Sequence, residues 1–476
     1  MSADPELGAA RRSVRQLAHP IRLVMLAIAL VLIFLGLADE SALGGGEGFG
    51  WAQAALVAVG IAVLALALAP LAWSARGLAL LISLGLTLTA AELVLRRALG
   101  PRYYTSIQLD ERTLYRLNPG TQREYTRAPI NGGLRIRYGI NSAGFRGEEL
   151  APPGTLPRVV VYGDSFIQAE FSRTEDTFAD RLEAHLARRL GKPVEVVNAG
   201  VAGYGPDQEL RRMETELVSL RPQLVVVAIY AGNDFGDVLR NKLYRLQTDG
   251  SLRDNAYAVD ETVKRRVAVA QSELILKKVL RDALRGMHGD AHAGIRTGSV
   301  ARRERVEAAL AQLEAEYREY VVEGDDTVHE LMSDPYNADV SLTPQSASAK
   351  YRIAMLDQIV ERMRATAQAE RVPLLLVLIP SPIDVSDEHE SGEVDVVRHP
   401  EYRRSALTDA LKEICERHGV PVVNLFEPFS ARGARELYLK GVDDHWNEPG
   451  QDFAAELVSD FVVARDLLAV HGGGSP

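Results

Sequence analysis

A β-branched apolar run that stops at a Gly-Asp-Ser turn constrains the fold of this chain more than any other feature. Residues 159–162 read Val-Val-Val-Tyr, Gly-Asp-Ser follows at 163–165, and residues 178–190 then show an amphipathic helical pattern. A buried strand followed by a turn and a helix is typical of open α/β sheets, which bind their ligands at the carboxyl ends of the strands. We therefore hypothesise that Ser165 is a nucleophile.

Strand and helix patterns alternate along the rest of the chain. Apolar runs predict further strands at residues 194–198, 224–230, 374–380 and 422–425. Amphipathic patterns predict helices at residues 208–220, 354–369, 406–417 and 454–468. This order predicts an α/β fold in which helices cover both faces of a parallel sheet.

The alternation breaks between residues 239 and 345. Charged helical patterns occupy residues 272–284 and 299–320, and a glycine-rich piece with His288 and His292 separates them. Glycines interrupt the helix that would align the two histidines, so a surface loop is favoured over a metal site, and we predict neither a metal nor a cofactor. An insertion of this size beside an active site is a candidate lid.

Apolar residues concentrate in the first hundred positions. Three segments, at about 21–38, 51–73 and 77–95, are each about long enough to cross a bilayer, which takes roughly 20 helical residues. A cleaved signal peptide is the alternative for the first segment. Its apolar run is longer than the usual ~7–15 residues of such peptides, and two further spans follow. Glu92 lies close to the end of the third span.

The charges of the flanking segments predict the orientation. The amino-terminal tail carries several arginines, whereas the loop at 38–50 has acidic residues and neither Lys nor Arg. The positive-inside rule then places the amino terminus in the cytoplasm. Three crossings put the rest of the chain outside, which corresponds to a multi-pass inner-membrane protein with a periplasmic domain. Arg96, Arg97 and Arg102 just after the third span oppose this orientation.

The chain thus divides into three parts. Residues 1–100 are the predicted membrane anchor. Residues 101–155 alternate polar with apolar residues between Asn-Gly and Pro-Gly turns, which predicts a β-rich linker region. Residues 156–476 form the predicted α/β domain, with the helical insertion at about 239–345.

The overall charge and the cysteine count argue against a nucleic-acid partner and against two kinds of cysteine-based site. The formal net charge of -10 and the pI near 5.6 argue against a nucleic-acid partner, because phosphate binding draws on clustered Lys and Arg. Cys415 is the only cysteine, which excludes an intrachain disulfide and a cysteine-based zinc site.

Polar residues follow several predicted strands and would gather at one rim of the sheet. Gly203 lies in a glycine-rich loop after the second strand, Asn233 follows the third strand, and Asp443 and His445 come late in the chain. Taken singly, each has a structural reading: a turn glycine, a helix cap, a core histidine. Together they match the needs of acyl transfer, in which an imidazole held by a carboxylate deprotonates the serine. The N–H groups of Ser165 and Gly203 and the Asn233 amide would stabilise the oxyanion.

Four sequence blocks occur in this order, and they contain Ser165, Gly203, Asn233 and His445. With these blocks the chain resembles the SGNH/GDSL hydrolase superfamily over approximately residues 156 to 470. The resemblance implies a flavodoxin-like three-layer sandwich and hydrolysis or transfer of acyl groups, with Ser165, Gly203, Asn233 and His445 in the roles above. The usual late block has an Asp three residues before the histidine, where this chain has Val442. The expected carboxylate is therefore that of Asp443. The carboxylate of Asp444 is the second choice, since it would point to the opposite side of an extended segment.

The leading hypothesis is a membrane-anchored serine esterase or deacylase that acts outside the cytoplasm on an acylated carbohydrate or lipid. One alternative is an O-acyltransferase that modifies a cell-envelope polysaccharide through the same serine. The other is a non-catalytic envelope assembly protein that kept the fold. The residues that follow the Gly-Asp-Ser turn, Phe166-Ile167-Gln168, do not identify the substrate, and the sequence does not determine the oligomeric state.

Overall fold

The computed structural model describes residues 5–38, 50–103, 107–272, 274–280, 298–387, 389–441 and 443–468. The contacts within the chain divide it into two compact units. The first unit contains residues 1–100 and also residues 272–283 of the insertion, and the second contains the remainder.

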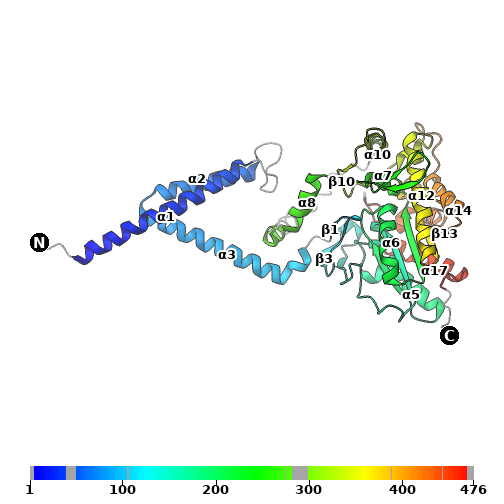
Figure 1. Ribbon diagram of the computed structural model, residues 1–476, viewed down its shortest axis with the longest axis horizontal. Helices are drawn as coiled ribbons and strands as arrows, with labels where there is room; N and C mark the ends of the chain where they lie inside the picture. Colours follow the sequence, from blue (N-terminus) through cyan, green and yellow to red (C-terminus); the bar gives the residue numbers. More distant parts are fainter. Residues whose placement is uncertain are drawn as a thin grey trace. The chain divides into compact units, whose positions relative to one another are not determined.

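Three helices make up most of the first unit (Figure 1): α1 (Pro5–Leu37), α2 (Trp51–Leu68) and α3 (Leu71–Tyr103). Two described stretches, His19–Leu37 and Leu71–Ala98, are long and apolar enough to cross a membrane. The apolar stretch of α2 is shorter, so only two of the three predicted spans meet that criterion among the described residues. The predicted span at 51–73 is divided because Pro70 forces Ala69 into an extended conformation, which ends α2 at Leu68.

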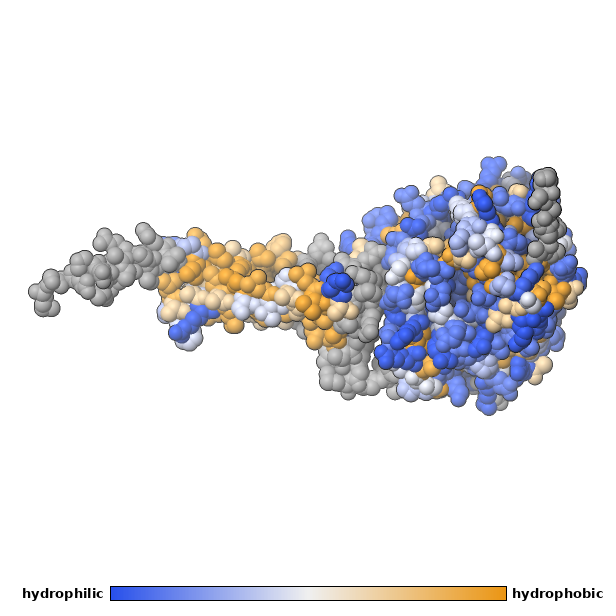
Figure 2. All heavy atoms as spheres, turned by 90° about the horizontal axis from the view of Figure 1, so that it is seen from below, coloured by the Kyte–Doolittle hydropathy of each residue, from blue (hydrophilic) through white to orange (hydrophobic). Residues whose placement is uncertain are grey.

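Glycines allow α1 and α2 to pack closely as an antiparallel pair. A Cβ on Gly60 would lie 2.6 Å from Ile33 Cγ1, and one on Gly36 would lie 2.9 Å from the Gln53 carbonyl oxygen. Backbones approach in this way between transmembrane helices with small residues at the contact. The outer surface of the described helical residues is largely hydrophobic (Figure 2), with Leu30 and Leu80 each more than 60% exposed.

Glu92 of α3 has partners inside the first unit. Its carboxylate accepts hydrogen bonds from the backbone N–H groups of Ile275 at 3.0 Å and Leu276 at 2.9 Å, and Arg96 Nε lies 2.6 Å away. The carboxylate thus caps the amino end of the helical residues 275–280. This contact explains how an acidic residue is accommodated near the end of an apolar helix.

A five-stranded parallel sheet forms the centre of the second unit (Figure 1). Its spatial order is β6 (Glu195–Gly200), β5 (Arg158–Gly163), β7 (Leu224–Tyr230), β12 (Leu374–Ile379) and β13 (Val422–Asn424). Counted along the chain this is the order 2-1-3-4-5 of flavodoxin-like sheets, which bind ligands where the order reverses, between the first and third strands. The prediction of an α/β fold with a parallel sheet is confirmed.

Side-chain alternation along the strands divides the core into two layers. Val160 and Tyr162 face the layer under α6 (Pro206–Leu220), α12 (Ala347–Ala369) and α14 (Ala406–Arg417). Val159 and Val161 face the layer under α5 (Phe178–Leu190) and α17 (Glu448–Ala464). Helix α17 begins six residues before the predicted start because Asn447 caps it and Pro449 occupies its first turn.

The remaining elements lie mostly before the sheet and within the insertion. Two antiparallel hairpins, β1 (Ile107–Asp110) with β2 (Leu114–Leu117) and β3 (Gln122–Thr126) with β4 (Arg135–Gly139), occupy the predicted β-rich region. The insertion contains β8 (Tyr244–Leu246), β9 (Leu252–Asp254), β10 (Ala258–Val259), α8 (Glu261–Ser272), α10 (Ser299–Tyr317), β11 (Thr327–Val328) and α11 (Ala338–Leu342). The four short strands in it were not predicted. The piece with His288 and His292 lies outside the described residues.

Short helices connect the other elements of the second unit. They are α4 (Ser165–Gln168), α7 (Asp234–Arg240), α13 (Pro382–Val385), α15 (Phe426–Arg432) and α16 (Ala434–Leu437). Two of them, α4 and α7, begin directly after β5 and β7, at the carboxyl edge of the sheet.

Candidate active site

Ser165 is the first residue of α4, directly after strand β5, and is half-buried. Asp164 caps this short helix, because its Oδ1 accepts a hydrogen bond from the Phe166 N–H at 2.9 Å. Among the described residues, none makes a hydrogen bond to Ser165 Oγ or accepts one from its N–H. Both groups are therefore available to a substrate.

His445 is held by the predicted carboxylate. Its Nδ1 lies 2.7 Å from Asp443 Oδ1, and the same oxygen accepts a hydrogen bond from the His445 N–H at 3.0 Å. This double contact fixes Nδ1 as the protonated nitrogen and leaves Nε2 as the base.

Asp444 does not point away from the imidazole, contrary to the expectation for an extended segment. Its Oδ1 lies 3.6 Å from His445 Nδ1, and its Oδ2 accepts a hydrogen bond from Tyr230 Oη at 2.7 Å. The reason is local: the backbone N–H of His445 donates to Asp443 Oδ1, and this hydrogen bond folds the segment into an Asx turn. Both carboxylates therefore lie beside His445.

Aromatic contacts bring His445 to the residue that follows the serine. The imidazole centroid lies 5.2 Å from the Phe166 ring and 5.3 Å from the Phe171 ring. Among the described residues, no hydrogen bond joins Ser165 Oγ to His445.

The surrounding carboxylates keep His445 basic. Burial lowers the pKa of its imidazole, but the hydrogen bond to Asp443 and the charges of Asp444, Asp443 and Asp164 outweigh it and raise the pKa to about 9. Burial raises the pKa of Asp443, and the contacts with His445 more than offset this, so that the pKa is lowered. The imidazolium and Asp443 thus form an ion pair at neutral pH. The pKa of Asp164 is raised to about 7, chiefly by burial.

The loop after β6 exposes a backbone donor. Gly203 has a φ of +74°, and a Cβ there would lie 2.8 Å from Tyr115 Oη. This backbone conformation and the close approach both favour glycine. No described residue accepts a hydrogen bond from the Gly203 N–H. The loop is tied to α4, because Asn198 Nδ2 donates to the Ile167 carbonyl at 2.7 Å and Gln168 Oε1 accepts from the Ala202 N–H.

Asn233 precedes α7 at the end of β7 and is only 3% exposed. Its side chain makes no capping hydrogen bond, and its Oδ1 has no partner in the described residues. Asn233 therefore occupies the N-cap position of α7, as its structural reading predicted, but its side chain does not cap the helix. A hydrogen bond from its side chain is among the interactions that lower the pKa of Asp334, although burial of that carboxyl raises the pKa overall.

Three residues at the site were not identified from the sequence. Tyr230 binds Asp444, Phe171 packs on His445, and Asp334 lies near Asn233. Tyr230 and Phe171 adjoin predicted motifs, so the neighbourhood of those motifs was a usable signal. Asp334 belongs to the insertion and had no signal in the sequence.

Among the residues that the structure describes, two groups of side chains could hold a metal ion. Asp443, Asp444 and His445 form one, but its atoms serve the pairing described above. The other is a cluster of Glu319, Asp325 and His329 in the insertion, where Lys242 Nζ already lies 2.6 Å from Glu319 Oε1. The ammonium group compensates the negative charge that a cation would otherwise neutralise.

Comparison with protein families identifies the domain. Residues 161–344 match the GDSL-like Lipase/Acylhydrolase family. The chain contains an SGNH/GDSL hydrolase domain. Members of this superfamily are serine hydrolases that act on esters, and the enzymatic class predicted from the motifs is confirmed. The matched residues include the serine, glycine and asparagine blocks but not the late Asp-His block.

Solved structures of lipases and esterases are similar to the chain at low identity. The lipase/acylhydrolase from Enterococcus faecalis is 13% identical with a TM-score of 0.31, over 65% of this chain and 97% of that chain. A GDSL-like lipase from Bacteroides thetaiotaomicron is 12% identical with a TM-score of 0.29, over 66% and 93%. A two-domain esterase active on acetylated mannans is 11% identical with a TM-score of 0.29, over 67% and 52%. No curated protein is significantly similar in sequence.

Proposed function

We propose that this protein is a membrane-anchored serine esterase that removes acyl groups from a glycan or a lipid outside the cytoplasm. The observation that carries the proposal is the pairing of Asp443 with His445, at 2.7 Å between carboxylate and imidazole, against the ring of Phe166, which directly follows Ser165. The unpaired N–H groups of Ser165 and Gly203 in the described residues add an oxyanion site to this pair.

In the proposed mechanism Ser165 Oγ attacks the ester carbonyl while His445 Nε2 takes its proton. Asp443 stabilises the imidazolium that forms, as in other serine hydrolases. The negative charge on the carbonyl oxygen is stabilised by the N–H groups of Ser165 and Gly203 and by the Asn233 amide. The alcohol leaves with the proton from His445. Water then attacks the acyl-enzyme with His445 again as base, which releases the acid and restores Ser165.

The anchor and its orientation are part of the proposal. Helix α2 runs antiparallel along α1 through the glycine contacts at Gly36 and Gly60, and this supports α2 as a third crossing. At 18 residues it is about 27 Å long, close to the hydrocarbon thickness of about 30 Å. An odd number of crossings with a cytoplasmic amino terminus puts the hydrolase domain in the periplasm.

Esterase activity of the full chain in detergent tests the chemistry. We expect release of p-nitrophenol from p-nitrophenyl acetate, and a rate near background for Ser165→Ala and for His445→Ala. Matched controls are the exposed-site variants Ser219→Ala and His329→Ala, which should keep the wild-type rate. Equal rates for wild type and Ser165→Ala, without labelling of Ser165 by a fluorophosphonate, would refute the proposal. Acylation of an added oligosaccharide at the expense of acetate release would reassign the same site to acyl transfer.

A further inference from the structure

The loop that carries Asn233 is held from outside by the insertion. The backbone N–H of Asn337 donates to the Gly232 carbonyl at 2.7 Å, and its Nδ2 donates to the Ala231 carbonyl at 3.1 Å. Asn337 is completely buried. Two consecutive carbonyls directly before Asn233 are thus bound by one residue that lies about a hundred positions later in the chain.

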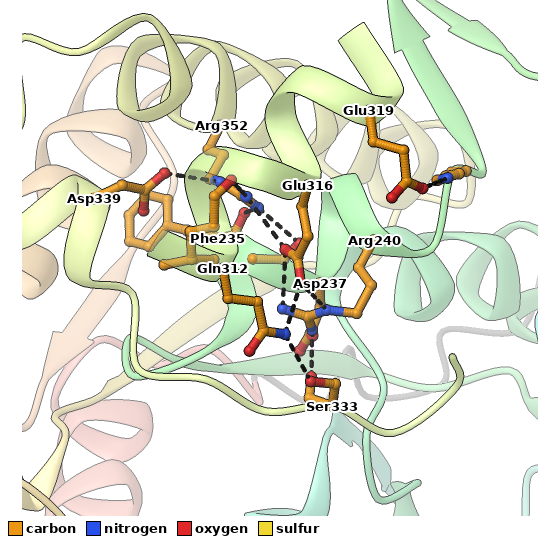
Figure 3. A network of polar contacts seen from close by, with 12 residues as sticks. Phe235, Asp237, Arg240, Gln312, Glu316, Glu319, Ser333, Asp339 and Arg352 are labelled. Atoms are coloured by element: carbon orange, nitrogen blue, oxygen red, sulfur yellow. Dashed lines mark hydrogen bonds and ion pairs between the residues drawn. The ribbon is translucent and has the colours of Figure 1, made fainter. Parts of the chain in front are cut away.

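Arg352 of α12 holds the other side of the same loop (Figure 3). Its Nη1 donates to the carbonyls of Gly236 at 3.0 Å and Phe235 at 3.3 Å, in the first turn of α7. The guanidinium is completely buried and rigid, so it defines where that turn begins. Asn233 immediately precedes this turn, and its position follows from it.

The remaining donors of Arg352 bind the insertion (Figure 3). Nε donates to Asp339 Oδ2 at 2.9 Å, and Nη2 donates to the Leu313 carbonyl at 2.8 Å and to Glu316 Oε2 at 3.3 Å. Asp339 is also completely buried. One guanidinium therefore joins α7, α10 and α11 to the central helix α12.

Arg240 closes the network at the far end of α7. Its Nε donates to Glu316 Oε1 at 3.1 Å, and its Nη1 contacts Asp237 and the Ser333 carbonyl (Figure 3). Glu316 thus binds both arginines. Moving α10 and α11 away would leave buried charges unpaired, which is strongly destabilising. The described part of the insertion from residue 299 to 342 is therefore tied to α7 and α12 by buried polar contacts, which favours a fixed support over the predicted lid for this part.

We propose that Arg352 and Asn337 are positioning residues that hold the Asn233 amide in the oxyanion site, and that the insertion exists in part to supply this support. The inference rests on the proposed role of Asn233 in the esterase reaction. It assigns no contact with the substrate to either residue, and each acts only through the loop at 231–236.

The first variant is Arg352→Lys in the full chain in detergent. Lysine keeps the charge beside Asp339 but loses the donors to the Phe235 and Gly236 carbonyls. We expect kcat for p-nitrophenyl acetate to fall by about 10-fold with KM within about twofold, because misplacing one oxyanion donor raises the barrier without changing ground-state binding. The matched control is Arg362→Lys on the same helix, where Arg362 binds Glu214 and Asp254 at the surface and does not contact α7.

The second step repeats the variant in an Asn233→Ala background, and Asn337→Ala replaces Arg352→Lys if the latter does not fold. If Arg352 acts through Asn233, the substitution Arg352→Lys should not lower kcat further once the Asn233 amide is absent. The kcat of the double variant should then equal that of Asn233→Ala within about twofold. A full additional 10-fold loss in the double variant would overturn the inference while leaving the esterase proposal intact. An unchanged kcat for Asn233→Ala, or an inactive wild type, would instead refute the oxyanion role and the inference with it.

Discussion

At the scale of single residues, Asp443 makes two contacts that define the base. One carboxylate oxygen binds both the Nδ1 and the backbone N–H of His445, so the backbone bond holds the carboxylate in place and the Nδ1 bond orients the imidazole. The negative charge of Asp444 also lies beside this imidazole, but its Oδ2 accepts a hydrogen bond from Tyr230 Oη. The sequence left the two carboxylates as alternatives. In the structure Asp443 binds the imidazole of His445, whereas Asp444 binds the hydroxyl of Tyr230.

The pH dependence of activity should separate the two carboxylates. The neutral imidazole is the base, so kcat/KM should rise with pH through the His445 pKa of about 9. Each of Asp443→Asn and Asp444→Asn removes a negative charge that favours the imidazolium, so each should lower this pKa and move the rising limb to lower pH. Only Asp443→Asn should also lower the maximal rate strongly, by about 10⁴-fold as in other triads that lose the orienting carboxylate. Initial rates from pH 6 to 10 check both effects, and a larger loss in Asp444→Asn would reverse the assignment.

At the scale of elements, the first hairpin is more than a linker before the domain. Tyr115 of β2 donates from Oη to the Ala202 carbonyl at 2.8 Å, and Tyr204 Oη binds the Tyr115 carbonyl in return. The two rings also meet edge to face at 5.2 Å. The hairpin therefore helps to hold the glycine-rich loop after β6, in addition to the ties between that loop and α4.

Replacement of Gly203 tests this loop. Gly203→Ala places a Cβ 2.8 Å from Tyr115 Oη at a φ of +74°, so the loop must shift and its N–H must leave the oxyanion site. We expect kcat for p-nitrophenyl acetate to fall by about 10²-fold, the usual effect of losing one oxyanion donor. Gly250→Ala is the matched control, since Gly250 also has a positive φ of +80° but no neighbour within 4 Å of its Cβ. Equal losses in the two variants would assign the effect to backbone strain alone.

At the scale of the whole molecule, the number of membrane crossings decides on which side the hydrolase domain lies. Two crossings would keep it on the side of the amino terminus, and three would place it on the opposite side. The only cysteine, Cys415, is 1% exposed, and burial raises the pKa of its thiol to about 12, so it is unreactive toward thiol reagents. An added surface cysteine can therefore be labelled without background.

Cysteine labelling in spheroplasts that express the full chain measures the topology. Val397 is 88% exposed, and Val397→Cys should react with a membrane-impermeant maleimide in intact spheroplasts. Ser2→Cys should react only after lysis, and the unaltered chain should not react in either case. Labelling of both variants only after lysis would place the domain in the cytoplasm and refute the third crossing.

The apolar pattern of the chain was enough to predict the parallel sheet and the residues that follow its strands. These are local properties: apolar periodicity marks a buried strand, and the ends of parallel strands share one edge, so Ser165, Gly203 and Asn233 were expected at that edge. The catalytic roles assigned to them remain proposals. Motif order was also enough to recognise the superfamily, because it records residue types at fixed places in the fold.

Features that depend on contacts between distant parts of the chain became apparent only in the fold. The insertion was predicted to be a candidate lid because of its size and its place beside the predicted active site. In the fold its Asp339 is buried against Arg352, and its Asn337 binds the loop of Asn233. The expectation that Asp444 points away from His445 was wrong for a related reason. The hydrogen bond between the His445 N–H and the Asp443 side chain makes a turn, and this turn changes the direction of the Asp444 carboxylate. Periodicity records which face of an element is apolar, whereas the partner of a buried polar group is set by the packing of elements far apart in the chain.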